Sequence, residues 1–253
     1  MKIQIDKELS MFKNLLLLAI VCLIAVPSSH ADRRKYVWTY QTTTIAPEAT
    51  ELEFYQTTKI NENENDNWEY RIEVEQGISS KFDIGIYQIF SQEASESLKW
   101  NAFQLRGRYR FGLPGEVAFN PVLYLEYRRK IETTAGQNKI ETKILLGKDV
   151  GKTNFSINPV FEYLWASGFD SYKEVGVDVG LSYAPSYKFA FGVESTTRQV
   201  YYTEIGKENK SESSFGPTIS YATGENYYTV GIAFGLNDHA DDTMVRFLMG
   251  IGL

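Results

Sequence analysis

The chain is poor in the residues on which many folds and active sites depend. Among its 253 residues it has one cysteine, Cys22, and two histidines, His30 and His239. A single cysteine leaves no pair for an intramolecular disulfide, so stability must come from another source. No window after residue 31 is apolar enough to form a transmembrane helix. Disulfide-rich folds and helical membrane folds are therefore excluded.

The N-terminal residues have the layout of a secretory signal peptide. Lys13 precedes an apolar stretch from Leu15 to Val26, and Ser29 and Ala31 are small residues at the −3 and −1 positions of a cleavage site. We therefore expect residues 1–31 to be a leader that is cleaved after Ala31. Cys22 is not interpreted as a lipoprotein site, because the residue before it, Val21, is not small.

The charge balance is acidic. The chain carries a net charge of −6, and its first 31 residues hold three lysines and two acids, so residues 32–253 carry −7. An acidic chain argues against nucleic acid as a partner. Nothing in the sequence indicates a cofactor or a metal, and we expect none.

Nearly every segment after residue 50 alternates between apolar and polar residues. In "FQLRGRYRFG", residues 103–112, Arg106, Arg108 and Arg110 occupy every second position. A period of two indicates a strand with two different faces. The alternating runs are about ten residues long, which suits a tilted membrane-spanning strand, whereas strands of soluble sandwiches are nearer five or six.

The connections between these runs alternate in length. Short turns are expected at 78–81, 112–116, 149–152, 184–187 and 222–225, and longer polar loops at 61–66, 92–99, 130–138, 166–173, 198–212 and 237–242. This asymmetry is typical of outer-membrane barrels, which have short periplasmic turns and longer external loops. Counting from Glu51 gives twelve strands, and fourteen stays open as an alternative.

Three parts of the chain follow from this count: the leader 1–31, an N-terminal segment 32–50 and a barrel 51–253. The segment contains "YVWTYQTTT", Tyr36 to Thr44, which could extend the barrel wall, enter the lumen or pair below the membrane. The residues do not decide between these placements. They also leave open whether loop 198–212 folds into the pore.

The small residues decide which face points outward. Glycines gather on the polar face of the strands, where an inner wall needs room, and aromatic residues lie near the ends of the apolar face. Both features favour a barrel with its apolar face toward lipid. The predicted fold class is therefore all-β, an antiparallel transmembrane β-barrel in contact with membrane lipid. Leu105 and Tyr109 would then face lipid, and Arg106 and Arg108 between them would face the lumen.

The C-terminal stretch "MVRFLMGIGL" resembles the assembly signal of Gram-negative outer-membrane proteins. Its apolar residues alternate from the terminus, although the family pattern closes with Phe or Trp and this chain closes with Leu253. The start, "YVWTYQTTTIAPEATELEFYQTT", looks like the N-terminal repeat of a group of uncharacterised proteobacterial barrels. The resemblance implies location in the outer membrane and a partner in the outer-membrane assembly machinery. The residues of this signal are Val245, Phe247, Met249, Ile251 and Leu253.

The sequence gives little support for an enzyme. A serine hydrolase acting on lipid would rest on His239 alone, and no Gly-x-Ser-x-Gly motif is present. The acidic stretches "NENEND" (61–66) and "NDHADD" (237–242) lack the spacing of a calcium-binding loop, so we interpret them as solvated loops. We therefore predict no catalytic and no metal-binding residues.

The luminal face carries the functional candidates. They are charged residues at alternating positions: Arg71, Glu73, Glu75, Arg106, Arg108, Arg110, Glu126 and Arg128. Pairing around a turn at 112–116 would place Arg106 opposite Val122, Arg108 opposite Asn120 and Arg110 opposite Ala118. Because neighbouring strands lie about 4.8 Å apart, an arginine could reach Glu73 or Glu75 two strands away by passing over Gly85.

Two hypotheses follow for the lumen. In the first, the arginines line a narrow, porin-like channel for small polar or anionic solutes. In the second, paired charges fill a closed barrel, which has a structural role or binds partners through its outer loops. Twelve strands lie between small filled barrels and wide aqueous ones, so the strand count does not choose between them.

Overall fold

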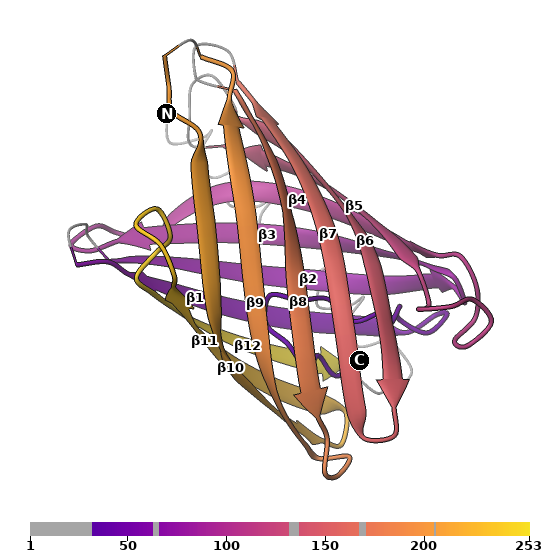
Figure 1. The fold of residues 1–253 in the computed structure, drawn as a ribbon. Helices are drawn as coiled ribbons and strands as arrows, with labels where there is room; N and C mark the ends of the chain where they lie inside the picture. The colour runs from indigo at the N-terminus through magenta and orange to yellow at the C-terminus, as the bar shows by residue number, and fades with distance from the viewer. Residues whose placement is uncertain (1–31, 63–65, 132–136, 167–170, 205) are drawn as a thin grey trace, which may run out of the picture.

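The computed structural model describes residues 32–62, 66–131, 137–166, 171–204 and 206–253. The predicted leader, 1–31, lies outside the described residues, as does part of "NENEND". The described chain forms a closed barrel of twelve antiparallel strands (Figure 1). They are β1 Thr50–Ile60, β2 Asn67–Ser79, β3 Phe82–Glu93, β4 Lys99–Arg110, β5 Val122–Lys130, β6 Asn138–Val150, β7 Thr153–Trp165, β8 Tyr172–Tyr183, β9 Phe189–Tyr202, β10 Lys210–Thr223, β11 Asn226–Gly235 and β12 Thr243–Gly252.

Each strand pairs with the next along the chain, and β1 closes the ring by pairing with β12. Closure begins at Glu51 opposite Gly252 and runs to Ile60 opposite Thr243. The prediction of an all-β barrel with twelve strands is confirmed. Strands of nine to fourteen residues also match the expected length. Within the described residues, no helix is long and apolar enough to cross a bilayer.

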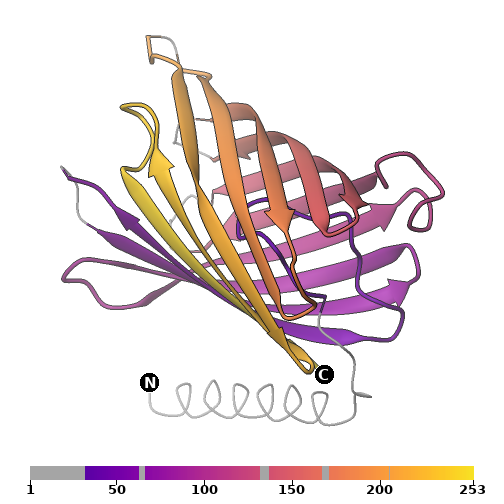
Figure 2. The ribbon, with the colours of Figure 1, turned by 60° about the horizontal axis from the view of Figure 1, so that its bottom comes forward.

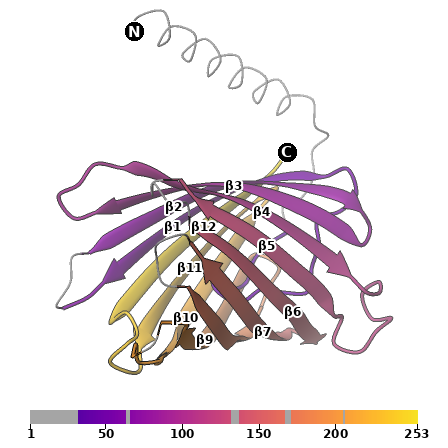
Figure 3. The same ribbon diagram turned by 90° about the horizontal axis from the view of Figure 1, so that it is seen from above.

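The barrel is inverted relative to a soluble protein. On β4, Leu105 and Tyr109 are 43% and 45% exposed on the outer surface, whereas Arg106 and Arg108 between them are 3% and 4% exposed. The same alternation runs around the ring, with Ile84, Ile86 and Leu125 outside. Apolar side chains outside and charges inside are the arrangement of a transmembrane barrel. Strong tilt of the strands is visible from above (Figure 3).

The connections follow the predicted asymmetry except at one place. Most connections at one end are as short as residues 80–81, 151–152 and 224–225, but β4 and β5 are joined by residues 111–121. The prediction of a short turn at 112–116 is therefore wrong. Phe119 and Asn120 adopt positive φ values of 60° and 46°, which end the extended backbone although the apolar alternation continues through them.

This longer connection shifts the register of β4 against β5. Arg106 lies opposite Glu126, Arg108 opposite Tyr124 and Arg110 opposite Val122, and the predicted pairing was wrong by four residues. Strands β9 and β10 also extend further than expected. Because β9 ends at Tyr202 and β10 begins at Lys210, much of the predicted loop 198–212 belongs to the barrel wall.

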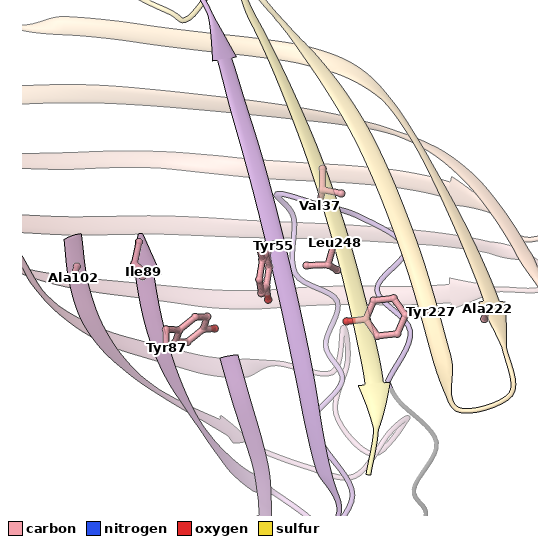
Figure 4. Close-up of a cluster of buried hydrophobic side chains, with 8 residues drawn as sticks. All are labelled: Val37, Tyr55, Tyr87, Ile89, Ala102, Ala222, Tyr227 and Leu248. Atoms are coloured by element: carbon pink, nitrogen blue, oxygen red, sulfur yellow. The ribbon is translucent and has the colours of Figure 1, made fainter. Parts of the chain in front are cut away.

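Residues 32–49 form what we call the luminal loop. It contributes no strand and lies inside the ring, where Figure 2 shows its indigo trace between the strands. Its Val37 packs in a buried cluster with wall side chains such as Tyr55, Tyr227 and Leu248 (Figure 4). Of the three placements left open by the sequence, the structure thus has the segment in the lumen.

Two glycines of the wall leave space for this loop. A Cβ atom at Gly231 would lie 2.4 Å from Cγ2 of Val37, and one at Gly180 would lie 2.8 Å from the ring of Tyr36. Both distances are shorter than a van der Waals contact. These positions favour glycine because side chains of the loop approach the wall closely.

The inverted polarity predicts that a charge on the outer surface is costly according to its depth. Ile86, near the middle of β3, and Ile78, near the 80–81 turn, are 44% and 53% exposed. Ile86→Arg should lower the free energy of unfolding in phospholipid vesicles by about 2–4 kcal/mol, and Ile78→Arg by about 0–1 kcal/mol. Urea titration measures both values. If both substitutions lowered the free energy of unfolding by the same small amount, burial of this surface in lipid would be contradicted.

Candidate functional site

The lumen is divided by the luminal loop into two unlike parts. The loop enters at the end of the short connections, which faces the periplasm in outer-membrane barrels. From Arg34 it climbs to Glu194 and Asn158 in the walls of β9 and β7, and it returns to Asp83 at the start of β3. The part of the lumen beside the loop and the part above the loop differ in packing and in charge.

Glu194 is the main anchor of the loop. Its carboxylate accepts hydrogen bonds from three consecutive backbone N–H groups, those of Val37 at 2.8 Å, Trp38 at 2.9 Å and Thr39 at 2.7 Å. Thr39 is fully buried. Hydrogen bonds to an ionised acceptor are stronger than neutral ones, so this single side chain fixes the top of the loop.

Further wall residues hold the loop by its backbone. Asn158 accepts from the N–H of Tyr40 at 2.6 Å and donates to the carbonyl of Tyr40 at 3.1 Å. Arg110 donates to the carbonyl of Thr42 at 2.6 Å, and Asp83 accepts from the N–H of Ile45 at 3.0 Å. Because these bonds come from β3, β4, β7 and β9, the loop is tied to several sides of the barrel.

The first residue of the described chain is also tied down. The backbone N–H of Asp32 donates to Glu51 at 2.8 Å, and burial raises the pKa of the Asp32 carboxyl to about 6. Burial disfavours the charged form of a carboxyl group. The start of the loop is therefore held against β1.

Beside the loop, an ion-pair cluster fills the half of the lumen nearest the short connections, which we call the periplasmic half. Arg106 lies 3.0 Å from Glu73 and 2.6 Å from Glu75, and Arg108 lies 2.9 Å from Glu75 and 2.8 Å from Asp83. All five side chains are almost completely buried. The cavity at this level measures only about 10 Å³. Side chains and the luminal loop therefore fill most of this half of the lumen.

The geometry of the cluster confirms the predicted reach over Gly85. A Cβ atom there would lie 2.3 Å from Oε1 of Glu73 and 3.2 Å from Nη2 of Arg106. Glu53, Glu73 and Glu75 also come within 4.8 Å of one another through their oxygens, a spacing that could hold a metal ion. Arg106 already pairs with two of these carboxylates, so the group fits an ion-pair cluster better than a metal centre.

Above the loop, the lumen opens into a cavity of about 360 Å³ that we call the vestibule. Val37, Trp38 and Tyr40 of the loop form its floor, and its walls are mainly charged. A second cavity of about 520 Å³ lies next to it toward the long connections and shares Lys59, Glu69, Arg128 and Lys139 with it. The two large cavities of the barrel therefore lie toward the long connections, at the end that we call external.

The predicted luminal residues divide between these two parts. Glu73, Glu75, Arg106 and Arg108 join the ion-pair cluster, and Arg110 holds the loop. The other three, Arg71, Glu126 and Arg128, line the vestibule. There Arg71 and Arg128 share the carboxylate of Glu69, at 2.7 Å and 3.0 Å. A role of these residues in selectivity stays a prediction.

Sequence reasoning missed two sets of residues. Glu194 and Asn158 were visible only as polar positions on alternating strands, and nothing in the sequence shows that their partners are backbone groups of a distant segment. Arg198 was assigned to a loop, but it is part of β9 and pairs with Glu174 at 3.0 Å and Asp178 at 2.6 Å. His239 lies in the connection 236–242 and does not line the vestibule.

Comparison with protein-family models and with curated proteins gives no match. Among solved structures, the chain is similar to an outer membrane channel from Pseudomonas putida F1, with a TM-score of 0.63 and 9% identity over 87% of this chain and 100% of that one. The NanC porin has a TM-score of 0.54 and 12% identity over 80% and 100% of the two chains. The KdgM porin, solved in complex with disordered oligogalacturonate, has a TM-score of 0.50 and 9% identity over 80% and 99%. The chain thus has the fold of outer-membrane β-barrels.

The anchoring by Glu194 can be tested with a cysteine probe, because residues 32–253 contain no cysteine. Thr39→Cys should be protected from a polar maleimide while the loop is docked. Adding Glu194→Ala removes three charge-assisted hydrogen bonds and should speed labelling by about a hundredfold or more. Ser186→Cys, in the exposed connection 184–188, is the control and should label at one rate in both backgrounds. Equal protection of the introduced thiol at position 39 in both backgrounds would exclude Glu194 as the anchor.

The ion-pair cluster gives a prediction about stability. Arg108→Gln leaves Glu75 and Asp83 buried without this partner and should lower the free energy of unfolding by about 3 kcal/mol. The control is Lys35→Gln, which removes a pair with the largely exposed Asp149 and should cost less than about 1 kcal/mol. Urea titration gives both values. A stable Arg108→Gln barrel with altered ion selectivity would instead make Arg108 a selectivity residue.

Proposed function

We propose that the protein is an outer-membrane channel for small polar solutes, with access from the external side. The observation that carries this proposal is the vestibule, an open cavity of about 360 Å³ inside a barrel whose outer surface is apolar. Pockets of this size accept small molecules. Similarity in fold to outer membrane channels and porins supports the same conclusion.

The lining of the vestibule carries a small cationic excess. Its lining contains seven cationic residues, Lys59, Arg71, Arg128, Lys139, Lys143, Arg198 and Arg246, against five acidic ones, Glu69, Glu126, Glu141, Glu162 and Asp178. The whole chain has a net charge of −6, so this excess is local. A narrow cavity lined by an excess of one charge raises the local concentration of ions of the opposite sign.

The luminal loop restricts passage. With the periplasmic half filled by the loop and the ion-pair cluster, a solute in the vestibule crosses only where the loop moves or leaves a narrow path. The loop is held mainly by hydrogen bonds from wall side chains to its backbone, and such bonds can exchange with water. The docked state is therefore a low-conductance state of the channel.

The filled half also supports a second candidate function, a closed barrel that binds solutes or partners from outside without transport. Its cavity of only about 10 Å³ beside the loop is the specific observation in favour. The two functions differ in whether ions cross the barrel. An enzymatic function has no comparable support, since His239 lies outside the vestibule.

We further propose that the C-terminal strand directs assembly in the outer membrane. In β12, Val245, Phe247, Met249 and Ile251 alternate with the more deeply buried Leu248 and Gly250. Their side chains thus form the outer, lipid-facing side of the strand that closes the barrel. A signal on this side is accessible before closure and is buried in lipid afterwards.

Conductance in planar bilayers tests the channel. The purified protein should give small steps, and a variant lacking residues 33–45 should give steps several-fold larger, because the loop no longer occupies the lumen. The double variant Glu194→Ala/Asn158→Ala, which keeps the loop but removes its anchors, should flicker between the two levels. Circular dichroism controls for an intact barrel. Absence of steps from both the protein and the loop deletion would reject the channel and favour the closed barrel.

Selectivity gives a second measurement. Arg71→Gln with Arg128→Gln removes two cations from the vestibule and should lower the anion-to-cation permeability ratio, measured as the reversal potential in a salt gradient. Lys188→Gln, an exposed residue of the 184–188 connection, removes one cation outside the lumen and should leave the ratio unchanged. A reversal potential that is the same in all three proteins would contradict selection in the vestibule.

A further inference from the structure

Two opposing walls of the vestibule differ in the sign of their net charge. In a closed ring of twelve strands, β12, β1 and β2 lie opposite β6, β7 and β8. The first group places three cations, Arg246, Lys59 and Arg71, and one acid, Glu69, in the vestibule. The second places three acids, Glu141, Glu162 and Asp178, and two cations, Lys139 and Lys143, there. The vestibule therefore has a transverse electric field in addition to its small cationic excess.

Arg246 is the most available cation of the first wall. Within the described residues its hydrogen bonds go to neutral acceptors, Oγ1 of Thr57 at 2.8 Å and the carbonyl of Val37 at 3.1 Å. Its guanidinium lies 5.5 Å from the ring centroid of Trp38 on the vestibule floor. Lys59, by contrast, pairs with Asp241 at 2.7 Å. Arg246 can thus accept an anionic group without breaking an ion pair.

The opposite wall carries a row of carboxylates. Strand register places Glu126 opposite Glu141, Glu141 opposite Glu162, and Glu162 opposite Glu174, so four glutamates follow one another across β5 to β8. Four cations belong to the same wall, against these four glutamates and Asp178. Arg128 of β5 reaches across to Glu69 at 3.0 Å. Lys139 bridges Glu141 and Glu162, Lys143 pairs with Glu141, and Arg198 pairs with Glu174 and Asp178. The acids outnumber these cations, so this wall keeps a negative excess.

We infer that the vestibule binds amphoteric solutes, which carry a carboxylate and an ammonium group on one small molecule, as short peptides do. The carboxylate faces Arg246, and the ammonium faces the glutamate row. A solute with both charges gains from both walls, whereas an anion alone meets the repulsion of the row and a cation alone that of the arginines. This inference rests on the proposed function only for external access to the vestibule.

The size and the floor of the vestibule fit this class of solute. A cavity of about 360 Å³ accommodates a molecule of two or three residues, and opposed walls require that its two charges be several ångströms apart. Trp38 and Tyr40 provide an apolar floor, flanked by Arg246 near Trp38 and by Lys143, whose Nζ lies 5.1 Å from the ring centroid of Tyr40. A peptide backbone can lie across these rings between the walls.

Trp38 provides a reporter for binding. The chain has four tryptophans, and the other three, Trp68, Trp100 and Trp165, do not line the vestibule. Replacing these three with phenylalanine leaves Trp38 as the only source of tryptophan emission. The full-length protein with these three substitutions is titrated in detergent with three matched probes, and calorimetry on the unsubstituted protein gives a measurement that does not depend on emission.

The probes are triglycine, N-acetyltriglycine and triglycine amide, which carry both charges, the negative charge alone and the positive charge alone. Triglycine should bind at least about tenfold more tightly than either blocked form. Arg246→Gln should weaken triglycine binding at least about fivefold and Arg246→Lys should largely restore it. Glu162→Gln should weaken triglycine but not N-acetyltriglycine, because only the ammonium group faces the glutamate row.

The outcomes separate this inference from the channel itself. Equal or tighter binding of N-acetyltriglycine would make the vestibule a plain anion site and overturn the inference. Absence of heat for all three probes in a protein that conducts ions would overturn it as well, while the channel stands. Tight triglycine binding by a protein that gives no conductance steps would support the inference and place it in a closed binding barrel.

Discussion

Pairing of the first strand with the last is the constraint on which the rest of the structure depends. A lipid environment offers no partners for backbone N–H and C=O groups, so a sheet in a membrane must have no free edge. The β1–β12 ladder satisfies the two edges at once. Once the ring is closed, the alternation along each strand places every second side chain in lipid. The polar side chains between them are enclosed in the lumen.

Enclosure of so many charges creates the second problem that the fold solves. Buried charges are tolerated only when they are paired and hydrogen-bonded. In the periplasmic half, Arg106 and Arg108 pair with Glu73, Glu75 and Asp83, and the luminal loop supplies backbone groups to Glu194 and Asn158. The charges of the external half are paired as well, as Lys139 is with Glu141 and Glu162, but they surround an open cavity. The two halves therefore differ in packing, and this difference leaves the vestibule free to hold a solute.

The luminal loop connects structure to function because it belongs to both parts. Its lower surface completes the filled half, and its upper surface, Val37, Trp38 and Tyr40, is the floor of the vestibule. Wall residues such as Gly180 and Gly231 are small where the loop passes. The luminal loop thus forms the floor of the solute site, narrows the lumen and carries the groups that anchor it to the wall. Movement of the loop would therefore change all three together.

The sequence by itself determined where most strands lie and the face that each residue takes, because alternation has a period of two and any shift by one residue would put charges such as Arg106 into lipid. It indicated twelve strands and left fourteen open, and the closed ring decided for twelve. It also indicated that Gly85 lets an arginine pass. It did not determine the β4–β5 register, since the apolar pattern runs through Phe119 although positive φ values end the strand there. Nor did it place the luminal loop, whose partners Glu194 and Asn158 lie more than a hundred residues away and bind its backbone, which leaves no mark on side-chain pattern. Only the tertiary structure decided which charges are paired and which face open space, because that depends on strands that meet across the lumen.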